Sequence, residues 1–186
     1  MSRIRPCLSA IGPTAFLAAM LQGPAHGAVP EAFQETADRF SLPAQVLYAI
    51  ALTESGRRVD ANGTFRPWPW TLNVHGQGHF FSTRQAAETR LRAWLADGED
   101  RIDVGLMQVH WRFHRDALGD PEQALDPVHN LRVAARILQR CLDRHTDAWV
   151  AAGCYHAPNH RERAARYRQR AQANWQRHVA QRADGR

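Results

Sequence analysis

The sequence contains no lysine, so its basic charge comes from 24 arginines, which exceed the 18 acidic residues by six. It has only three cysteines, and it shows no internal repeat and no low-complexity linker. Beyond residue 21, no apolar run is long enough to span a membrane. These absences exclude a multidomain array and a second membrane segment, and 186 residues suffice for one domain with its own core.

The N-terminus has the layout of a secretory signal. Two early arginines precede an apolar run over residues 7–21, and small residues follow it. We therefore predict a signal peptide at 1–27, cleavage before Ala28 and a mature domain at 28–186. An uncleaved anchor is the alternative, but the run is short for a bilayer. The expected location is the periplasm, with no stable membrane span after cleavage.

The predicted export bears on whether the cysteines of the mature domain form a disulfide. The first cysteine leaves with the signal peptide, and Cys141 and Cys154 form an isolated pair, most simply a disulfide in an oxidising compartment. A structural zinc held by these thiolates with His145 and His156 is a rival interpretation. We favour the disulfide because the spacing is not that of a standard zinc site.

The hydrophobic periodicity predicts a mainly α, α+β protein. The region 57–81 lacks a helical period and contains prolines and aromatic residues, so we expect a small β-hairpin or an ordered loop there. Ser82 and Thr146 are expected to cap helices. Helices are predicted over residues 31–40, 43–55, 83–96, 104–114, 127–144, 147–155 and 161–180, the last of them strongly basic.

Glu54 is the strongest candidate for chemistry. It follows an apolar helical run and precedes Gly56, a natural helix stop. Burial favours the protonated form of a carboxyl group, which a general acid requires. The alternative is an exposed helix-end glutamate, although negative charge is unfavourable at a helix C-terminus. The local sequence does not choose between the two. Ser55 is a helix-end hydroxyl that can orient Glu54 or substrate.

Four short motifs follow one another along the chain. They are Glu54-Ser55-Gly56, Gly105-Leu106-Met107-Gln108-Val109, Leu125-Asp126-Pro127 with Asn130-Leu131, and Cys154-Tyr155-His156. In this order the chain resembles the lytic transglycosylases with a soluble-lytic-transglycosylase (SLT), lysozyme-like domain, over about residues 42–167. A Pro-Trp-Pro-Trp segment at 67–70 resembles the small exported members of conjugation and secretion systems.

The resemblance implies a helical bundle around a glycan cleft, peptidoglycan strands as substrate and no cofactor. One glutamate, here Glu54, protonates the glycosidic oxygen between N-acetylmuramic acid and N-acetylglucosamine, and then acts as base while a 1,6-anhydro ring closes. Gly105 keeps the backbone close to substrate, Gln108 binds sugar, and the Tyr155 hydroxyl lies near the glutamate. The resemblance also implies components of a cell-envelope secretion or conjugation complex as partners.

His156 stands where the family commonly has asparagine, so this chain departs from the pattern. The histidine can still bind sugar, and it can make activity depend on pH. Asp103 is interpreted as a helix N-cap, with a second carboxylate of a hydrolytic muramidase as the alternative. Trp68 and Trp70 are candidates for stacking on glycan. A catalytically silent peptidoglycan-binding protein is a further alternative.

Two other kinds of binding receive little support. His110 and His114 lie four residues apart and can hold a metal with His75 or His79, but no glutamate completes a metalloprotease pattern, so we predict no metal site. Charge alone suits nucleic acid. Export and the absence of a recognisable reading motif argue against it, so we expect no nucleic-acid partner.

Overall fold

The computed structural model describes residues 29–59 and 63–183, and the predicted signal peptide at 1–27 lies outside the described residues. The described part is mainly α, as predicted. Its helices are α1 (Glu31–Arg39), α2 (Ala44–Glu54), α3 (Arg84–Ala96), α4 (Trp111–Leu118), α5 (Pro121–Ala124), α6 (Pro127–Leu142), α7 (Ala148–His156) and α8 (Arg161–Ala183). Its strands are β1 (Gly56–Arg58), β2 (Phe65–Pro67), β3 (Thr71–Val74), β4 (Gln77–Phe80), β5 (Ile102–Val104) and β6 (Val109–His110).

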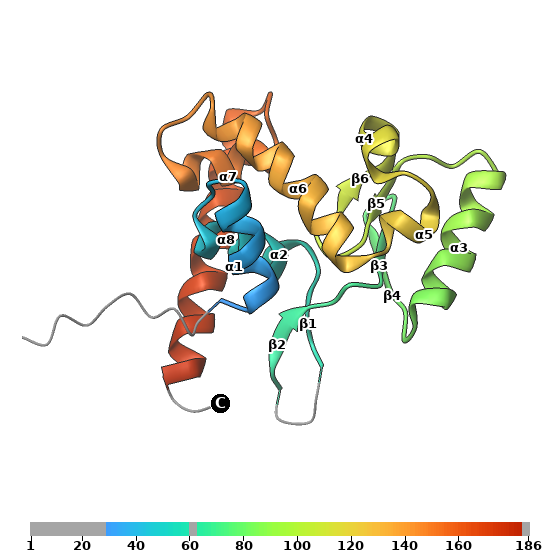
Figure 1. Ribbon diagram of the computed structural model, residues 1–186, viewed down its shortest axis with the longest axis horizontal. Coiled ribbons are helices and arrows are strands. Elements are labelled where there is room, and N and C mark those ends of the chain that lie inside the picture. The colour runs from blue at the N-terminus through green and yellow to red at the C-terminus, as the bar shows by residue number, and fades with distance from the viewer. Residues whose placement is uncertain (1–28, 60–62, 184–186) are drawn as a thin grey trace, which may run out of the picture.

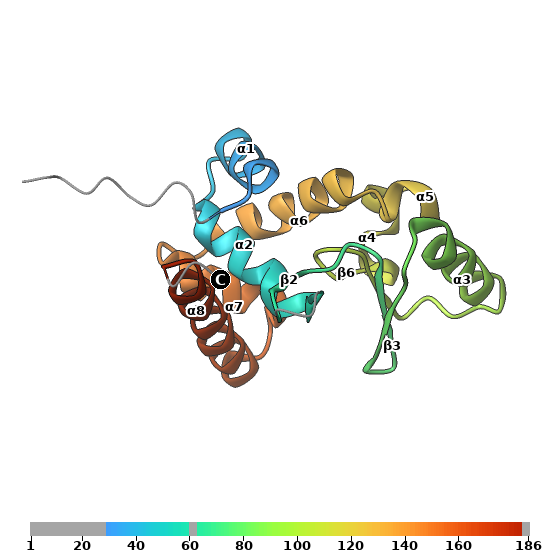
Figure 2. The same cartoon turned by 90° about the horizontal axis from the view of Figure 1, so that it is seen from below.

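The helices form two groups that α6 connects. α1, α2, α7 and α8 gather at one end of the molecule, whereas α3, α4, α5 and the larger sheet lie at the other end (Figures 1 and 2). The α6 helix runs between the two groups (Figure 1). Its start is fixed as predicted, because the Asp126 side chain accepts a hydrogen bond from the His129 amide and Pro127 occupies the first turn.

The α2 helix is the centre of the first group. From Ala44 to Leu52 every residue except Gln45 is buried, as its apolar composition predicts. The long basic helix α8 packs against α2 and α7, and its buried side chains are Tyr167 and Ala171. α2 begins one residue later than predicted, with Pro43 in the cap position.

Gly56 does not act as a left-handed helix stop. It opens β1, and a Cβ there would lie 2.2 Å from the Leu52 carbonyl oxygen and 2.4 Å from the Phe65 ring. The glycine is therefore required by the close approach of two segments. The region 57–81 forms two hairpins rather than one: β1 pairs with β2, and β3 pairs with β4.

The predicted helix over 104–114 is wrong. Residues 102–110 form β5, a turn and β6 in a sheet of order β4-β3-β5-β6, and α4 begins only at Trp111. Asp103 pairs across the sheet with Asn73 and His110, so it is a strand residue and not a helix cap. Pairing with β3 supplies backbone hydrogen bonds that the local sequence does not reveal.

Two caps are displaced by one residue. Thr83, not Ser82, caps α3 and accepts a hydrogen bond from the Ala86 amide. Asp147, not Thr146, caps α7 and accepts from two backbone amides. In both places two good capping residues are adjacent, so sequence alone does not select one. Within the described residues, no helix has the length and apolar character required to cross a membrane.

Candidate active site

Glu54 is the last residue of α2 and lies in a cavity of about 430 Å³. Its side chain is only 15% exposed. The cavity is walled by the β5–β6 hairpin, α4, α6 and the end of α7, so it lies where the two groups of helices meet. Of the residues predicted from sequence to form the site, Gln108, Tyr155 and His156 line the same cavity.

Hydrogen bonds from a buried asparagine, Asn130, fix the turn between β5 and β6. The Asn130 side chain accepts a hydrogen bond from the Met107 amide (2.8 Å) and donates to the carbonyl oxygens of Val104 (2.9 Å) and Ala124 (3.1 Å). Gly105 has φ +80°, and a Cβ there would lie 2.7 Å from the Asn130 side-chain nitrogen. Gly105 is itself buried, so glycine is needed here for the approach of Asn130.

Ser55 connects the end of α2 to this turn. The residue is fully buried, and its hydroxyl lies 2.6 Å from the Leu106 carbonyl oxygen, to which it donates a hydrogen bond. A hydroxyl that is buried and already bonded cannot contact a sugar directly. Ser55 is therefore placed to orient Glu54 relative to the turn, the first of the two roles considered from sequence, and not to orient substrate directly.

Gln108 and Tyr155 both line the cavity and are both tied to the β5–β6 turn. The Gln108 side-chain nitrogen donates to the Gly105 carbonyl oxygen (2.8 Å) and the Thr71 carbonyl oxygen (3.1 Å). This fixes the amide so that its oxygen is the group left to accept from a ligand. The Tyr155 hydroxyl donates to the Met107 carbonyl oxygen at 2.8 Å. Burial raises the Tyr155 pKa well above its ordinary value, and the nearby Glu54 raises it further.

His156 is the polar neighbour of Glu54 on the exposed side. Its Nδ1 lies 3.8 Å from a Glu54 carboxylate oxygen, and 38% of its side chain is exposed. Its ring stacks on Tyr167, with ring centroids 4.4 Å apart and an interplanar angle of 10°. The histidine that departs from the family pattern is thus held beside the carboxylate by an aromatic partner.

Tyr167 was missed by the sequence reasoning. Its hydroxyl is buried and makes no hydrogen bond of good geometry within the described residues. Burial raises the Tyr167 pKa well above its ordinary value, and the proximity of Glu54 raises it further. The hydroxyl therefore lies close to the carboxylate. The available signal was a tyrosine within the arginine-rich run of 161–170.

Asp103 places a second carboxylate in the cavity. It lines the same cavity as Glu54, together with its strand partner His110. Burial raises the pKa of the Asp103 carboxyl above its ordinary value of 3.8; Glu54 raises it further, while His110 and His156 oppose the effect. The carboxyl that was interpreted as a helix cap is therefore a titratable group facing the site.

Two arginines and an exposed phenylalanine also line the cavity, and none of the three was predicted from sequence to be a site residue. Arg140 and Arg144 line it from α6 and the residues that follow, and Phe113 of α4 lines it with 71% exposure. Burial lowers the pKa of His114, another lining residue, and the nearby charge of Arg140 lowers it further. Exposed rings beside a polar cleft are the kind of surface on which sugars stack.

Trp68 and Trp70 are not among the residues that line this cavity. The Trp68 ring nitrogen donates to the Phe81 carbonyl oxygen at 2.7 Å, and the Arg57 guanidinium lies 5.0 Å from the Trp68 ring centroid. Trp70 packs edge-on against Trp68 and against the core. The Trp68 amide donates to the Ser55 carbonyl oxygen (3.0 Å), so the tryptophan pair adjoins the end of α2, although neither residue lines the Glu54 cavity.

Cys141 and Cys154 form the predicted disulfide, which joins the end of α6 to α7. The two sulfurs are bonded to each other, so the zinc alternative is wrong. His75, one of the histidines considered as a metal ligand, has its Nε2 2.8 Å from a Glu99 carboxylate oxygen. Across the described residues, no group of three or more His, Cys, Asp or Glu side chains is arranged to hold a metal ion.

Fold and site define a helical protein with a cleft that holds a largely buried carboxylate at the end of a buried helix. The family model for the transglycosylase SLT domain matches residues 31–177, most of the chain, and the chain belongs to this family. Searches of curated proteins and of solved structures gave no significant match. The mainly α, lysozyme-like fold predicted from sequence is confirmed, and family membership implies binding of peptidoglycan and action outside the cytoplasm.

Proposed function

We propose that the protein is a peptidoglycan lytic transglycosylase that cleaves the β-1,4 bond between N-acetylmuramic acid and N-acetylglucosamine. The observation that carries the proposal is the position of Glu54, a largely buried carboxyl group that lines a cavity in an SLT domain. Gln108 and His156 line the cavity as sugar-binding groups, and Tyr155 holds the turn that carries Gln108. Trp68 and Trp70 are proposed to contact glycan further from the bond that breaks.

In this mechanism Glu54 donates its proton to the glycosidic oxygen, and the bond from that oxygen to the muramyl C1 breaks. The Glu54 carboxylate then takes the proton of the muramyl C6 hydroxyl, whose oxygen bonds to C1. The product is a 1,6-anhydro end, Glu54 returns to its protonated form, and no water is consumed. The Tyr167 hydroxyl supports the carboxylate stage, because a buried hydroxyl without another partner can donate to it.

The test is the identity of the product ends. Purified mature protein should release 1,6-anhydro muropeptides from isolated sacculi, as detected by mass spectrometry. Glu54→Gln keeps the shape of the side chain but removes the transferable proton, and it should abolish release. Glu35→Gln, at an exposed position on α1 that does not line the cavity, is the control and should leave release unchanged. Undiminished release by Glu54→Gln would refute the assignment.

A hydrolytic muramidase is the second candidate, and the observation that favours it is Asp103 in the cavity with Glu54. A second carboxylate can activate water for attack on C1, which leaves reducing ends instead of anhydro ends. Asp103→Asn separates the two functions: a muramidase loses release, whereas a transglycosylase that uses Glu54 alone keeps its anhydro products. Binding of sacculi without any release would favour the silent peptidoglycan-binding alternative.

The proposed setting is the periplasm, reached through the N-terminal signal peptide. Local opening of the wall for a secretion or conjugation apparatus is the purpose that the Pro-Trp-Pro-Trp segment supports. Loss of assembly of such an apparatus in a strain carrying Glu54→Gln, with normal assembly in the Glu35→Gln control, is the expected result. Normal assembly in both strains would refute this role.

A further inference from the structure

A second cavity, of about 770 Å³, adjoins the cavity that contains Glu54. It is formed by α7, the start of α8 and the segment before α7. Cys154 and Pro158 line both this cavity and the one that contains Glu54. The two cavities therefore adjoin each other at Cys154 and at Pro158, which is exposed.

The second cavity has an apolar floor and a cationic rim. Val150, Ala157 and Ala164 contribute to the floor. Gly153 of α7 lies so close to α8 that a Cβ there would meet the Ala164 carbonyl oxygen at 2.6 Å, so the two helices form a closely packed base. A preformed apolar surface with a few convergent charged groups is the usual form of a binding pocket.

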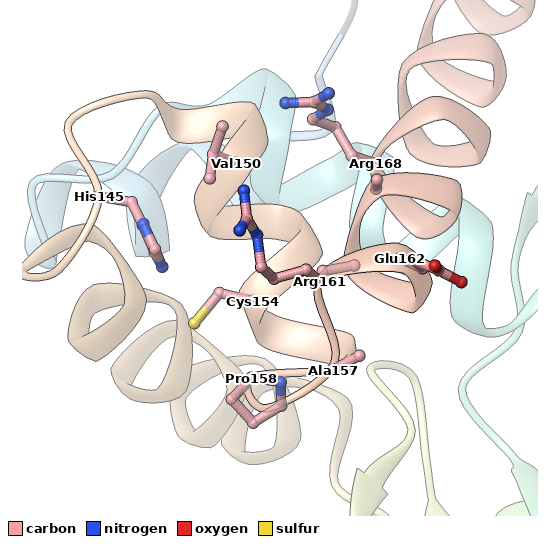
Figure 3. A pocket seen from close by; sticks show the side chains of 10 residues that line it. His145, Val150, Cys154, Ala157, Pro158, Arg161, Glu162 and Arg168 are labelled. Carbon is pink, nitrogen blue, oxygen red and sulfur yellow. The ribbon is translucent and has the colours of Figure 1, made fainter.

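The cations of the rim are Arg161 and Arg168, with the imidazole of His145 opposite them. Figure 3 shows the Arg161 side chain lying across α7 toward Val150, and Arg168 further along α8. Neither arginine forms an ion pair within the described residues. The one lining carboxylate, Glu162, points to the other side of α8 (Figure 3) and lies 3.6 Å from Arg166. The cavity therefore presents two uncompensated guanidinium groups.

We propose that this cavity binds the stem peptide of the peptidoglycan strand through the free carboxylates of the peptide. The proposal rests on the proposed function, because the muramyl sugar that carries the stem lies in the Glu54 cavity. Arg161 and Arg168 are separated by seven residues of one helix, about 10 Å along its axis. Three residues of an extended peptide span about the same distance. Carboxylates spaced along the stem can therefore meet both guanidinium groups, which bind carboxylates in a fork geometry.

The test compares two substrates: glycan strands that carry stem peptides, and the same strands after an amidase has removed the peptides. Wild-type protein should cleave the peptide-bearing strands about three- to tenfold faster, the range that two exposed ion pairs supply. The double variant Arg161→Gln/Arg168→Gln should lose this preference and keep its rate on bare strands. The preference of the wild type should also weaken as salt rises.

The matched control is Arg132→Gln/Arg163→Gln, which removes the same charge from exposed positions that line neither cavity. It should retain the preference. Equal loss in the control would overturn the proposal, because bulk charge would then explain the effect. Retention of the preference by Arg161→Gln/Arg168→Gln would also overturn it.

A titration with a soluble muramyl tetrapeptide gives an answer that does not depend on cleavage. Amide resonances of residues 157–168 should shift in the wild type and the control but not in the Arg161→Gln/Arg168→Gln variant. No shift in the wild type overturns the proposal. A shift that depends on the arginines, in a protein that cleaves neither substrate, supports the peptide site and refutes the proposed enzymatic function instead.

Discussion

Replacement of Gly105 by alanine tests whether the turn beside Glu54 depends on Asn130. Alanine at φ +80° costs about 1–2 kcal/mol in backbone strain. Its Cβ would lie 2.7 Å from the Asn130 side-chain nitrogen, so the fully buried asparagine must move. Asn130 makes three hydrogen bonds, each worth about 1 kcal/mol net. Losing most of them brings the total cost to about 3–5 kcal/mol.

The measurement is the free energy of unfolding from urea titrations followed by circular dichroism. The melting temperature should fall by about 10 °C or more. Gly76→Ala is the matched control, because Gly76 also has φ +80° but nothing lies within 4 Å of its Cβ position. It should show the backbone cost alone, about 1–2 kcal/mol.

A double-mutant cycle isolates the contact itself. In an Asn130→Ala background the obstructing side chain is absent and only the Ala124 carbonyl oxygen, 3.2 Å from the Cβ position, remains close, so Gly105→Ala should cost much less than in the otherwise wild-type protein. If Gly105→Ala and Gly76→Ala cost the same in the otherwise wild-type protein, the close approach of Asn130 does not constrain the turn and the reasoning fails.

Three further changes have distinct expected outcomes. Tyr167→Phe removes a buried hydroxyl without a good hydrogen bond, so the free energy of unfolding should change by less than about 1 kcal/mol. The rate of muropeptide release should nevertheless fall about ten- to a hundredfold. An unchanged rate refutes the role of Tyr167. Asp103→Asn removes a carboxyl group whose pKa is raised by burial. Because the folded state binds this proton more tightly than the unfolded state, the group stabilises the fold below its unfolded pKa of about 3.8. This contribution is lost as pH rises through the folded pKa. The variant should therefore gain stability relative to wild type as pH increases from about 4 to 7 in urea titrations, and a difference independent of pH contradicts this. Reduction of the Cys141–Cys154 disulfide, which joins residues 13 positions apart, should lower unfolding free energy by about 3 kcal/mol in calorimetry with and without a thiol reductant; an unchanged melting temperature is the contrary result.

The helices whose ends carry local signals were predictable from sequence. Asp126 and Pro127 mark the start of α6 because a capping carboxylate and a first-turn proline act within one turn. The strand β5 carries no such signal. Val104, Leu106 and Met107 fit a helical pattern equally well, and pairing with β3, some thirty residues earlier, decides the outcome.

The residues of the candidate site also divide into those that a local motif marks and those that only tertiary contacts bring together. Glu54, Gln108 and Tyr155 were found because they stand in recognisable motifs. Asp103 was interpreted as a cap because the strand around it was taken for a helix, and the error in secondary structure changed the chemistry assigned to it. Tyr167 faces Glu54 only because α8 packs against α2, a tertiary contact that no local pattern encodes.

The hydrogen bonds around Leu106 and Met107 also bear on how the protein folds. Three hydrogen bonds join this turn to distant parts of the chain. The Ser55 hydroxyl bonds to Leu106, 51 residues later in the sequence. Asn130 and Tyr155 both bond to Met107, which precedes them by 23 and 48 residues. Contacts of such long range form late, because the loops between them must close first. The cleft therefore acquires its shape only once α2, α6 and α7 have docked, so an incompletely folded chain outside the cytoplasm carries Glu54 without a site in which it can act.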